Sequence, residues 1–312
     1  MEVTSTSLLG MALVLGNNLK LFETLIEVSS EEKPATPLMV AEKAGLKERY
    51  VKEWLCCVAC GGIIEMDKSG ERFWLTKENA DVLCGPNASY MIPMISTFFQ
   101  FTHLMPQLQE VFKRSGPYGM TFDDYPGIYQ FIDYASQEKY KNHFIPDFIP
   151  LTGMSEKLRE GNLNVLDVGC GTGFHSLMCA KHFPSSSFIA CDFSKESIDT
   201  GISRKNNLKL ENLNFLVMDV RELPVEWTKK FDWVMMYNVC HDLIRPDLTL
   251  KEIRRVLKDG GVFTMADING TSNAYEDKQI DQLGSTMQYA VSLFHCLPVG
   301  SNASGKLKWV YC

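Results

Sequence analysis

The chain of 312 residues lacks an apolar run long enough to cross a membrane. Its longest early run, over residues 8–16, has nine residues, whereas a transmembrane helix needs about 20. Glu2 precedes this run and no basic residue does, so the charged start of a signal peptide is also missing. We therefore expect a cytoplasmic protein that has no membrane partner.

An excess of positive charge is missing as well. The 31 Lys and Arg residues and the 38 Asp and Glu residues give a net charge of −7. Non-specific binding of nucleic acid depends on neutralising phosphates with basic side chains, so this balance argues against a nucleic-acid partner. It does not exclude a single basic face on one part of the chain.

The ten cysteines and six histidines show no metal-binding pattern. Cys57 and Cys60 form an isolated C-x-x-C, but a zinc site would need a second ligand pair at a suitable spacing. In a cytoplasmic chain of this size the cysteines are expected to be free thiols. We therefore expect no metal.

The pattern of apolar residues changes near residue 150. Before it the spacing is mostly helical, and after it short strand-like runs alternate with amphipathic helical stretches. These patterns predict an α/β chain in three parts: a winged helix over residues 1–85, a helical connector with the substrate pocket over 86–150, and a Rossmann-like, doubly wound sheet over 151–312. The aromatic residues of the connector fit either a core between domains or an apolar substrate pocket.

The first part has the element order of a winged helix-turn-helix. The spacing predicts helices over 8–27, 37–44 and 47–60, followed by a hairpin over 63–76. This order suggests DNA binding, but residues 1–85 carry nine basic and thirteen acidic side chains, which is a poor surface for phosphates. We therefore favour a dimerisation or lid role, with a homodimer formed through this domain, over DNA binding.

A glycine-rich turn opens the third part. Residues 163–169 predict a strand, Gly169–Gly173 a turn and 174–183 a helix. Glycines allow the backbone to approach a ligand, and the free N–H groups of the helix start favour a negative group. Asp192 ends the next strand, 19 residues past Gly173; an acid at this place in such folds accepts hydrogen bonds from a ribose diol.

A dinucleotide fingerprint is not complete, because position 174, where its third glycine would stand, is Phe. Instead, the run VLDVGCGTG at 165–173 resembles motif I of class I S-adenosylmethionine-dependent methyltransferases, and the likeness extends over about residues 155–270. The N-terminal part is similar to the winged helix fused to small-molecule O-methyltransferases and to bacterial winged-helix methyltransferases. The resemblance implies an enzyme that transfers a methyl group from S-adenosylmethionine to a small molecule, with oxygen as the favoured acceptor.

The resemblance also implies roles for single residues in cofactor binding. The glycine-rich turn and the acid before it would hold the methionine part, Asp192 the ribose, and the residues after the second, third and fourth strands the adenine and the rest of the cofactor. The cofactor-binding candidates are Asp167, Gly169, Gly171, Gly173, Asp192, Phe193, Asp219, Val220 and Asn238. Asp219 could instead be a helix N-cap or a turn acid, because Asp is common at both places.

One histidine is the catalytic candidate. A phenol has a pKa near 10 and needs a base at neutral pH, and histidine titrates in a suitable range. His241 follows the fourth strand, where a His-Asp pair supplies the base in plant-type O-methyltransferases; alternatively it caps the strand or contacts the cofactor. The sequence departs from that pattern at Tyr237, where a Lys is usual, and at Leu243, where a Trp is usual.

The end of the chain is short for this family. Only 44 residues follow Ile268, and a helix over about 276–294 leaves room for one short strand over 306–312. The usual C-terminal strand pair is therefore expected to be incomplete. This leaves open a catalytically inactive, truncated scaffold as another function. A further alternative, which the winged helix suggests, is a DNA-binding regulator that senses S-adenosylmethionine.

Overall fold

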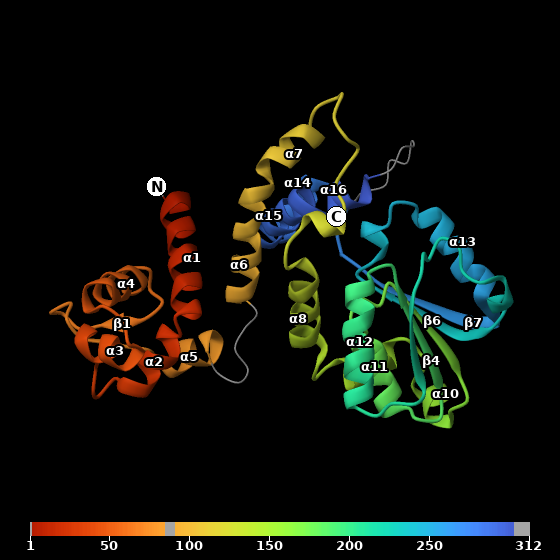
Figure 1. Cartoon of the computed structure of the whole chain (residues 1–312), viewed down its shortest axis with the longest axis horizontal. Helices are drawn as coiled ribbons and strands as arrows, with labels where there is room; N and C mark the ends of the chain where they lie inside the picture. Colours follow the sequence, from red (N-terminus) through yellow and green to blue (C-terminus); the bar gives the residue numbers. More distant parts are fainter. Residues whose placement is uncertain (1, 85–90, 303–312) are drawn as a thin grey trace. The chain divides into compact units, whose positions relative to one another are not determined.

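The computed structural model describes residues 2–84 and 91–302, and the chain divides into two units, residues 1–102 and 103–312 (Figure 1). The first unit contains six helices and a two-stranded wing within its described residues. Its elements are α1 (Glu2–Asn18), α2 (Leu21–Val28), α3 (Pro37–Ala44), α4 (Glu48–Cys60), β1 (Glu65–Met66), β2 (Phe73–Trp74), α5 (Lys77–Leu83) and α6 (Met91–Gln100).

The first unit has the predicted order of a winged helix, with one difference. The helix predicted over 8–27 is divided into α1 and α2, because Lys20 adopts a left-handed conformation with φ of 55° and breaks the helical path. The start of α3 follows the expected chemistry: the Thr36 side chain accepts a hydrogen bond from the Met39 N–H, and Pro37 occupies the first turn.

The core of the first unit lies between α2, α4 and the wing. Phe22, Leu55 and Phe73 are fully buried in it. The indole N–H of Trp54 donates to the Ala12 carbonyl at 2.9 Å and ties α4 to α1. Gly16 makes this packing feasible, since a Cβ at that position would lie 2.3 Å from the Trp54 ring.

The second unit is built on a five-stranded parallel sheet. Its strands are β3 (Asn164–Val168), β4 (Ser187–Asp192), β5 (Leu213–Val217), β6 (Phe231–Tyr237) and β7 (Leu257–Ala266), in the order β5-β4-β3-β6-β7. The order reverses at β3, which has β4 on one side and β6 on the other. Ligands in such sheets bind at this switch point, beyond the carboxyl ends of the strands. The predicted Rossmann-like, doubly wound fold is confirmed.

Helices cover both faces of the sheet (Figure 1). They include α10 (Ser155–Glu160), α11 (Phe174–His182), α12 (Lys195–Asn207) and α13 (Pro246–Val256). Neighbouring residues of β6 point to opposite faces: Trp233 belongs to one buried cluster, and Val234 to the other. Both faces are therefore packed, which is usual for an all-parallel sheet.

The last strand is irregular near its start. β7 begins at Leu257, which pairs with Phe231 of β6, and its next partner in the register is Val262, opposite Trp233. The register shifts between Phe231 and Trp233, and Gly260 has φ of 79° in this irregular part. The strand ends at Ala266, so Asp267 is the first residue past the sheet.

The segment predicted as a connector, 86–150, contributes to both units. Its described part contains α6 in the first unit, and α7 (Met105–Val111), α8 (Ile128–Tyr140) and α9 (Ile149–Leu151) in the second. Tyr140 and Phe144 are buried in the sheet core, whereas Phe122 and Tyr129 line a cavity. Some aromatic residues of this segment therefore belong to the core of the second unit and not to a core between domains, and others line a cavity whose use for substrate stays a prediction. The boundaries at 85 and 150 stay predictions.

The described chain ends in a helical segment with α14 (Ala274–Ile280), α15 (Gln282–Val291) and α16 (Leu297–Gly300). This segment packs against residues 119–125: the Met120 N–H donates to the Pro298 carbonyl at 2.9 Å, and the Tyr125 hydroxyl donates to the Phe294 carbonyl at 2.8 Å. No strand follows β7 up to residue 302. The short strand predicted over 306–312 lies outside the described residues.

Among residues 2–84 and 91–302, no single helix is long and apolar enough to cross a membrane. The pair α1 and α2 meets the length and composition criterion only when taken together, and the two helices are bent by 70° at their junction.

Candidate functional site

A cavity of about 390 Å³ lies at the carboxyl ends of the central strands of the second unit. Eight of the ten predicted site residues line it, which places residues from four successive strand ends around one space. These eight are Asp167, Gly169, Gly171, Asp192, Phe193, Asp219, Val220 and Asn238. Gly173 and His241 are not among the lining residues.

The glycines of the turn differ in what they do. All three have left-handed φ values, which favour glycine. A Cβ at Gly171 would meet nothing within 4 Å, so this backbone borders open space. A Cβ at Gly173 would lie 2.2 Å from the Phe215 ring, so Gly173 allows the turn to pack on β5. The sequence assigned both glycines to the ligand, and the geometry favours this role for Gly171.

Asp192 reaches back to the glycine-rich turn from the end of β4. Its carboxylate accepts hydrogen bonds from the backbone N–H of Gly171 at 2.8 Å and of Ser194 at 2.9 Å. The side chain is buried, and this burial raises the pKa of the carboxyl, while the backbone N–H groups act in the opposite direction. The acid and the turn, predicted to act on one ligand, therefore lie in direct contact.

Asp167 is a second buried acid beside this turn. Its carboxylate accepts a hydrogen bond from the Ser176 hydroxyl at 2.7 Å. Burial raises the pKa of Asp167 to about 7, the Ser176 hydrogen bond opposes this shift, and the nearby charge of Asp192 adds to it. Two buried carboxyl groups, those of Asp167 and Asp192, thus lie near the carboxyl ends of β3 and β4. A hydroxyl donates to the first, and backbone N–H groups donate to the second.

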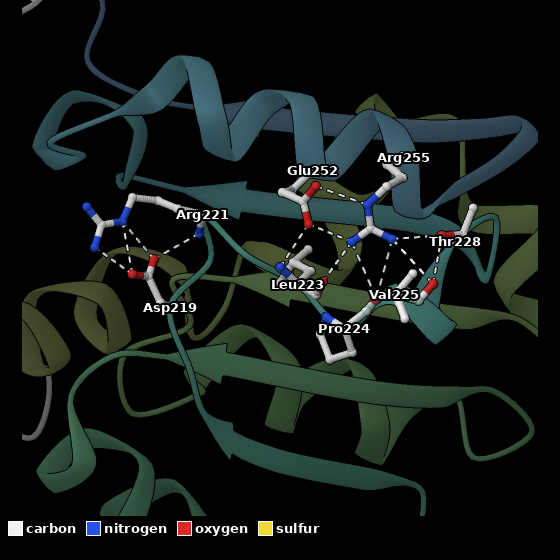
Figure 2. A network of polar contacts seen from close by, with 8 residues as sticks. All are labelled: Asp219, Arg221, Leu223, Pro224, Val225, Thr228, Glu252 and Arg255. Atoms are coloured by element: carbon white, nitrogen blue, oxygen red, sulfur yellow. Dashed lines mark hydrogen bonds and ion pairs between the residues drawn. The ribbon is translucent and has the colours of Figure 1, made fainter.

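Asp219 follows β5 and forms an ion pair with Arg221 (Figure 2). The guanidinium contacts the carboxylate at 2.5–3.0 Å, and the Arg221 N–H donates to it at 2.9 Å. The Arg221 guanidinium holds the pKa of Asp219 below its usual value. The hydrogen bond from the Arg221 N–H is typical of a turn acid, which the sequence left open as an alternative role for Asp219. Asp219 also lines the cavity.

A second network fastens the loop that follows Val220. The Arg255 guanidinium donates to the Leu223 carbonyl at 2.8 Å and to the Thr228 hydroxyl at 2.7 Å (Figure 2). Glu252 pairs with this guanidinium and accepts a hydrogen bond from the Leu223 N–H at 2.8 Å. The wall that carries Asp219 and Val220 is thereby tied to α13.

Asn238 stands at the end of β6 in a left-handed conformation, with φ of 53°. Asn is one of the few residues other than glycine that tolerate this region. Its N–H donates to the Ala266 carbonyl at 2.8 Å. The bend brings the next residue, Val239, against Gly169, where a Cβ would lie 2.5 Å from the Val239 side chain.

His241 is held between two carboxylates. Its Nδ1 lies 2.5 Å from Asp267, and its Nε2 lies 3.4 Å from Asp242. Burial would raise the pKa of Asp267, but the hydrogen bond and charge of His241 hold it below its usual value. His241 itself does not line the cavity, whereas Asp242 does.

Asp267 was missed by the sequence reasoning. The signal that could have found it is its position: it follows the fifth strand, and His241 follows the adjacent fourth strand. Tyr237 and Ala266 are register partners at those strand ends, so the residues just beyond them meet at one edge. A carboxylate at Nδ1 fixes the orientation of an imidazole and stabilises its charged form.

The cavity also has a wall of aromatic rings. Phe193 is 57% exposed, and its ring centroid lies 5.6 Å from that of Phe122. Phe122 in turn stacks on Tyr129 with a centroid distance of 5.7 Å. These partly open rings offer flat apolar surface beside Asp192, which suits an adenine ring.

The described residues contain one group with the donor types of a metal site: His241, Asp242 and Cys296, whose ligand atoms lie within 4.8 Å of one another. These atoms already contact each other or Asp267; the Cys296 thiol donates to Asp242. The contacts of His241 with Asp267 and of Cys296 with Asp242 account for part of this arrangement, whereas Oδ1 of Asp242 accepts no hydrogen bond from the described residues. The absence of a metal stays a prediction.

Comparison with known families agrees with this architecture. A family described as "Methyltransferase domain" matches residues 159–309, which shows that the chain carries a methyltransferase domain. Its N-terminal part matches, over residues 7–85, the family described as "Rv2258c-like winged HTH domain". The predicted combination of a winged helix followed by a methyltransferase domain is confirmed.

Individual relatives share part of the chain or its fold. A malonyl-[acyl-carrier protein] O-methyltransferase of Halalkalibacterium halodurans is 30% identical over 114 residues, 36% of this chain and 41% of the relative. The chain thus matches less than half of that relative's length. A Nostoc punctiforme protein assigned as an O-methyltransferase has a TM-score of 0.67 at 17% identity, covering 94% of this chain and 83% of its own.

The O-methyltransferase NcsB1 from neocarzinostatin biosynthesis has a similar fold, with a TM-score of 0.59 at 15% identity, covering 94% of this chain and 85% of its own. That structure holds S-adenosylmethionine and 2-hydroxy-5-methyl naphthoic acid. At these identities the likeness establishes a shared two-domain fold.

Proposed function

We propose that this protein is an enzyme that transfers a methyl group from S-adenosylmethionine to an oxygen atom of a small molecule. The observation that carries the proposal is the contact between Asp192 and Gly171 at the edge of the 390 Å³ cavity. A ribose-binding acid and an open backbone turn are the two features that an adenosyl ligand with a charged tail requires. The methyltransferase-domain match and the ligands of NcsB1 support the choice of cofactor.

The residues around the cavity fit this cofactor. Asp192 would accept hydrogen bonds from the ribose hydroxyls, and Gly171 would border the methionine part, where its missing Cβ leaves space. Phe193 and Val220 would pack on the adenine ring, with Asp219 near its amino group. When bound, S-adenosylmethionine supplies a methyl group on a good leaving group, so the protein's main task is to place the acceptor in line.

A hydroxyl acceptor also has to lose its proton, and we assign this task to His241. Asp267 would orient the imidazole through Nδ1 and stabilise the positive charge that it gains. Asp242, which lines the cavity beside it, places a second carboxylate near the other ring nitrogen. The acceptor would therefore enter from the side of the cavity at the ends of β6 and β7.

The proposal is tested by calorimetry with S-adenosylmethionine, with NAD as the comparison ligand. Methyl transfer is then followed by mass spectrometry over a panel of phenols and carboxylic acids, with amines and thiols beside them. We expect binding of S-adenosylmethionine, no binding of NAD, and methylation of an oxygen acceptor. The absence of S-adenosylmethionine binding would overturn the proposal. Binding without turnover on any acceptor would instead favour the inactive scaffold.

For the winged helix we propose a dimerisation or lid role, with a homodimer as the expected assembly. The basic side chains of α4 are already paired with acids: Arg49 with Glu53, and Lys52 with Glu71 at 2.6 Å. Such pairing leaves little free positive charge for phosphates. A gel-shift series at decreasing salt tests the alternative of a DNA-binding regulator; binding that strengthens at low salt would favour it. A cytoplasmic location stays a prediction.

A further inference from the structure

One face of α8 borders the cavity, although this helix ends at Tyr140, well before the glycine-rich turn at Gly169. The lining residues Tyr129, Ile132, Asp133 and Ser136 are spaced as neighbours on one helical face. Figure 1 shows α8 beside α12 in the second unit, and the side chains of Gln130 and Glu196 join the two helices at 2.8 Å. Asp133 is the one charged member of this face.

Asp133 joins α8 to two other elements. Its two carboxylate oxygens accept hydrogen bonds from the two terminal nitrogens of Arg204 on α12, each at 2.6 Å. Such a two-pronged pair is among the strongest polar contacts in proteins. The same carboxylate accepts a hydrogen bond from the Thr172 hydroxyl, and Arg204 donates to that hydroxyl at 3.1 Å.

The cluster is sheltered from water and stays charged. The side chain of Asp133 is 11% exposed and that of Arg204 is 32% exposed. Burial raises the pKa of Asp133, but the hydrogen bonds from Arg204 and Thr172 outweigh it and hold the pKa below its usual value. The pair is therefore ionised at neutral pH, and its contacts are screened less than those of a surface pair.

Thr172 is the residue through which this cluster reaches the cofactor site. It stands between Gly171 and Gly173, two residues in left-handed conformations that a glycine backbone can easily leave. On one side the turn is held by the contact of Gly171 with Asp192. On the other side the Thr172 hydroxyl is the side-chain contact that ties the turn to α8 and α12.

We propose that Asp133 and Arg204 are positioning residues that fasten α8 and Thr172 together and so fix the glycine-rich turn for the methionine part of S-adenosylmethionine. This inference rests on the proposed function. The inference predicts that loss of the pair weakens binding of the methionine part far more than binding of the adenosine part. In the proposed function, the residues after β4 and β5 hold the adenosine part.

The test compares the affinities of S-adenosylmethionine and adenosine by calorimetry in the full chain. We expect Asp133→Asn and Arg204→Met each to weaken S-adenosylmethionine binding about tenfold or more, and adenosine binding less than about threefold. The double variant should bind S-adenosylmethionine no more weakly than the single variants, because each substitution removes the same contact between Asp133 and Arg204. Asp199→Asn is the matched control, since Asp199 forms an exposed pair with Lys195 on the same helix.

Thr172→Val is a gentler variant that keeps the size of the side chain and removes its hydroxyl. It should weaken S-adenosylmethionine binding about threefold with an unchanged melting temperature, and it decides the question if the charge variants fail to fold. Unchanged S-adenosylmethionine affinity in the folded variants, or equal losses for both ligands, would overturn the inference alone. Failure of the unaltered protein to bind S-adenosylmethionine would overturn the proposed function, and the inference with it.

Discussion

Two clusters at the carboxyl edge of the sheet are built in different ways: one lines the cavity, and the other reaches it through Asp242. At the glycine-rich rim, defined as residues 169–173 with Asp192, backbone N–H groups hold a carboxylate. At the histidine rim, defined as His241, Asp242 and Asp267, carboxylates surround an imidazole and side chains hold one another. The backbone N–H groups hold the Asp192 carboxylate in place beside the cavity, whereas a histidine between carboxylates can take up a proton. The difference divides the proposed work into binding and proton transfer.

The largest effect is expected from His241→Ala at the histidine rim. Loss of a general base lowers kcat by about 10²- to 10⁴-fold, while S-adenosylmethionine affinity should stay unchanged because the glycine-rich rim is intact. Turnover of an oxygen acceptor and calorimetry measure the two quantities on one preparation. Full turnover in this variant would show that the histidine is not the base.

Asp267→Asn is the companion variant at this rim. It keeps the shape of the side chain and removes the negative charge at Nδ1, so kcat should fall by about 10- to 100-fold, less than with loss of the histidine itself. A loss of cofactor affinity in either variant would contradict the division between the two rims.

The next effect is expected from Asp192→Ala at the glycine-rich rim. Hydrogen bonds to a charged group contribute about 1.5–3 kcal/mol each, so S-adenosylmethionine affinity should fall by about 10- to 100-fold. Turnover at saturating cofactor should change far less. Asp259→Asn, an exposed acid paired with Lys229, is the control. Equal affinities of the Ala variant and the unaltered protein would defeat the ribose role.

The smallest effect concerns pH and stability. Burial raises the pKa of Asp167 to about 7, against about 3.9 in an unfolded chain. Between these values the folded chain binds a proton that the unfolded chain does not, so this contribution to stability is lost as pH rises from about 4 to 7. As pH rises over this range, the melting temperature of Asp167→Asn should fall by a few degrees less than the melting temperature of the unaltered protein. Parallel curves would show that Asp167 titrates normally.

The glycine-rich rim could be predicted because it is local. Strand, turn, helix and second strand follow one another within residues 163–192, so the spacing alone brings Asp192 to the turn. What the sequence did not reveal was the separate task of Gly173, since only the fold shows that Phe215 of β5 packs against it. A glycine pattern indicates that another group comes close to the backbone. It does not show whether that group is a ligand or an aromatic side chain.

The histidine rim was predicted only in part, because its partners come from separate segments. His241 and Asp267 lie 26 residues apart and meet through the pairing of β6 with β7. Asp133 and Arg204 are 71 residues apart, and their contact depends on how α8 lies on the sheet domain. No local pattern specifies that orientation, since the partners that hold α8 lie in α12 and in the glycine-rich turn, far away in the sequence.

The helical segment over 282–302 has a practical consequence. Asn302 lines the cavity, and the Pro298 carbonyl accepts a hydrogen bond from Met120, another lining residue. Proteolytic trimming back to residue 296 would therefore remove part of the cavity wall and the contact that holds Met120.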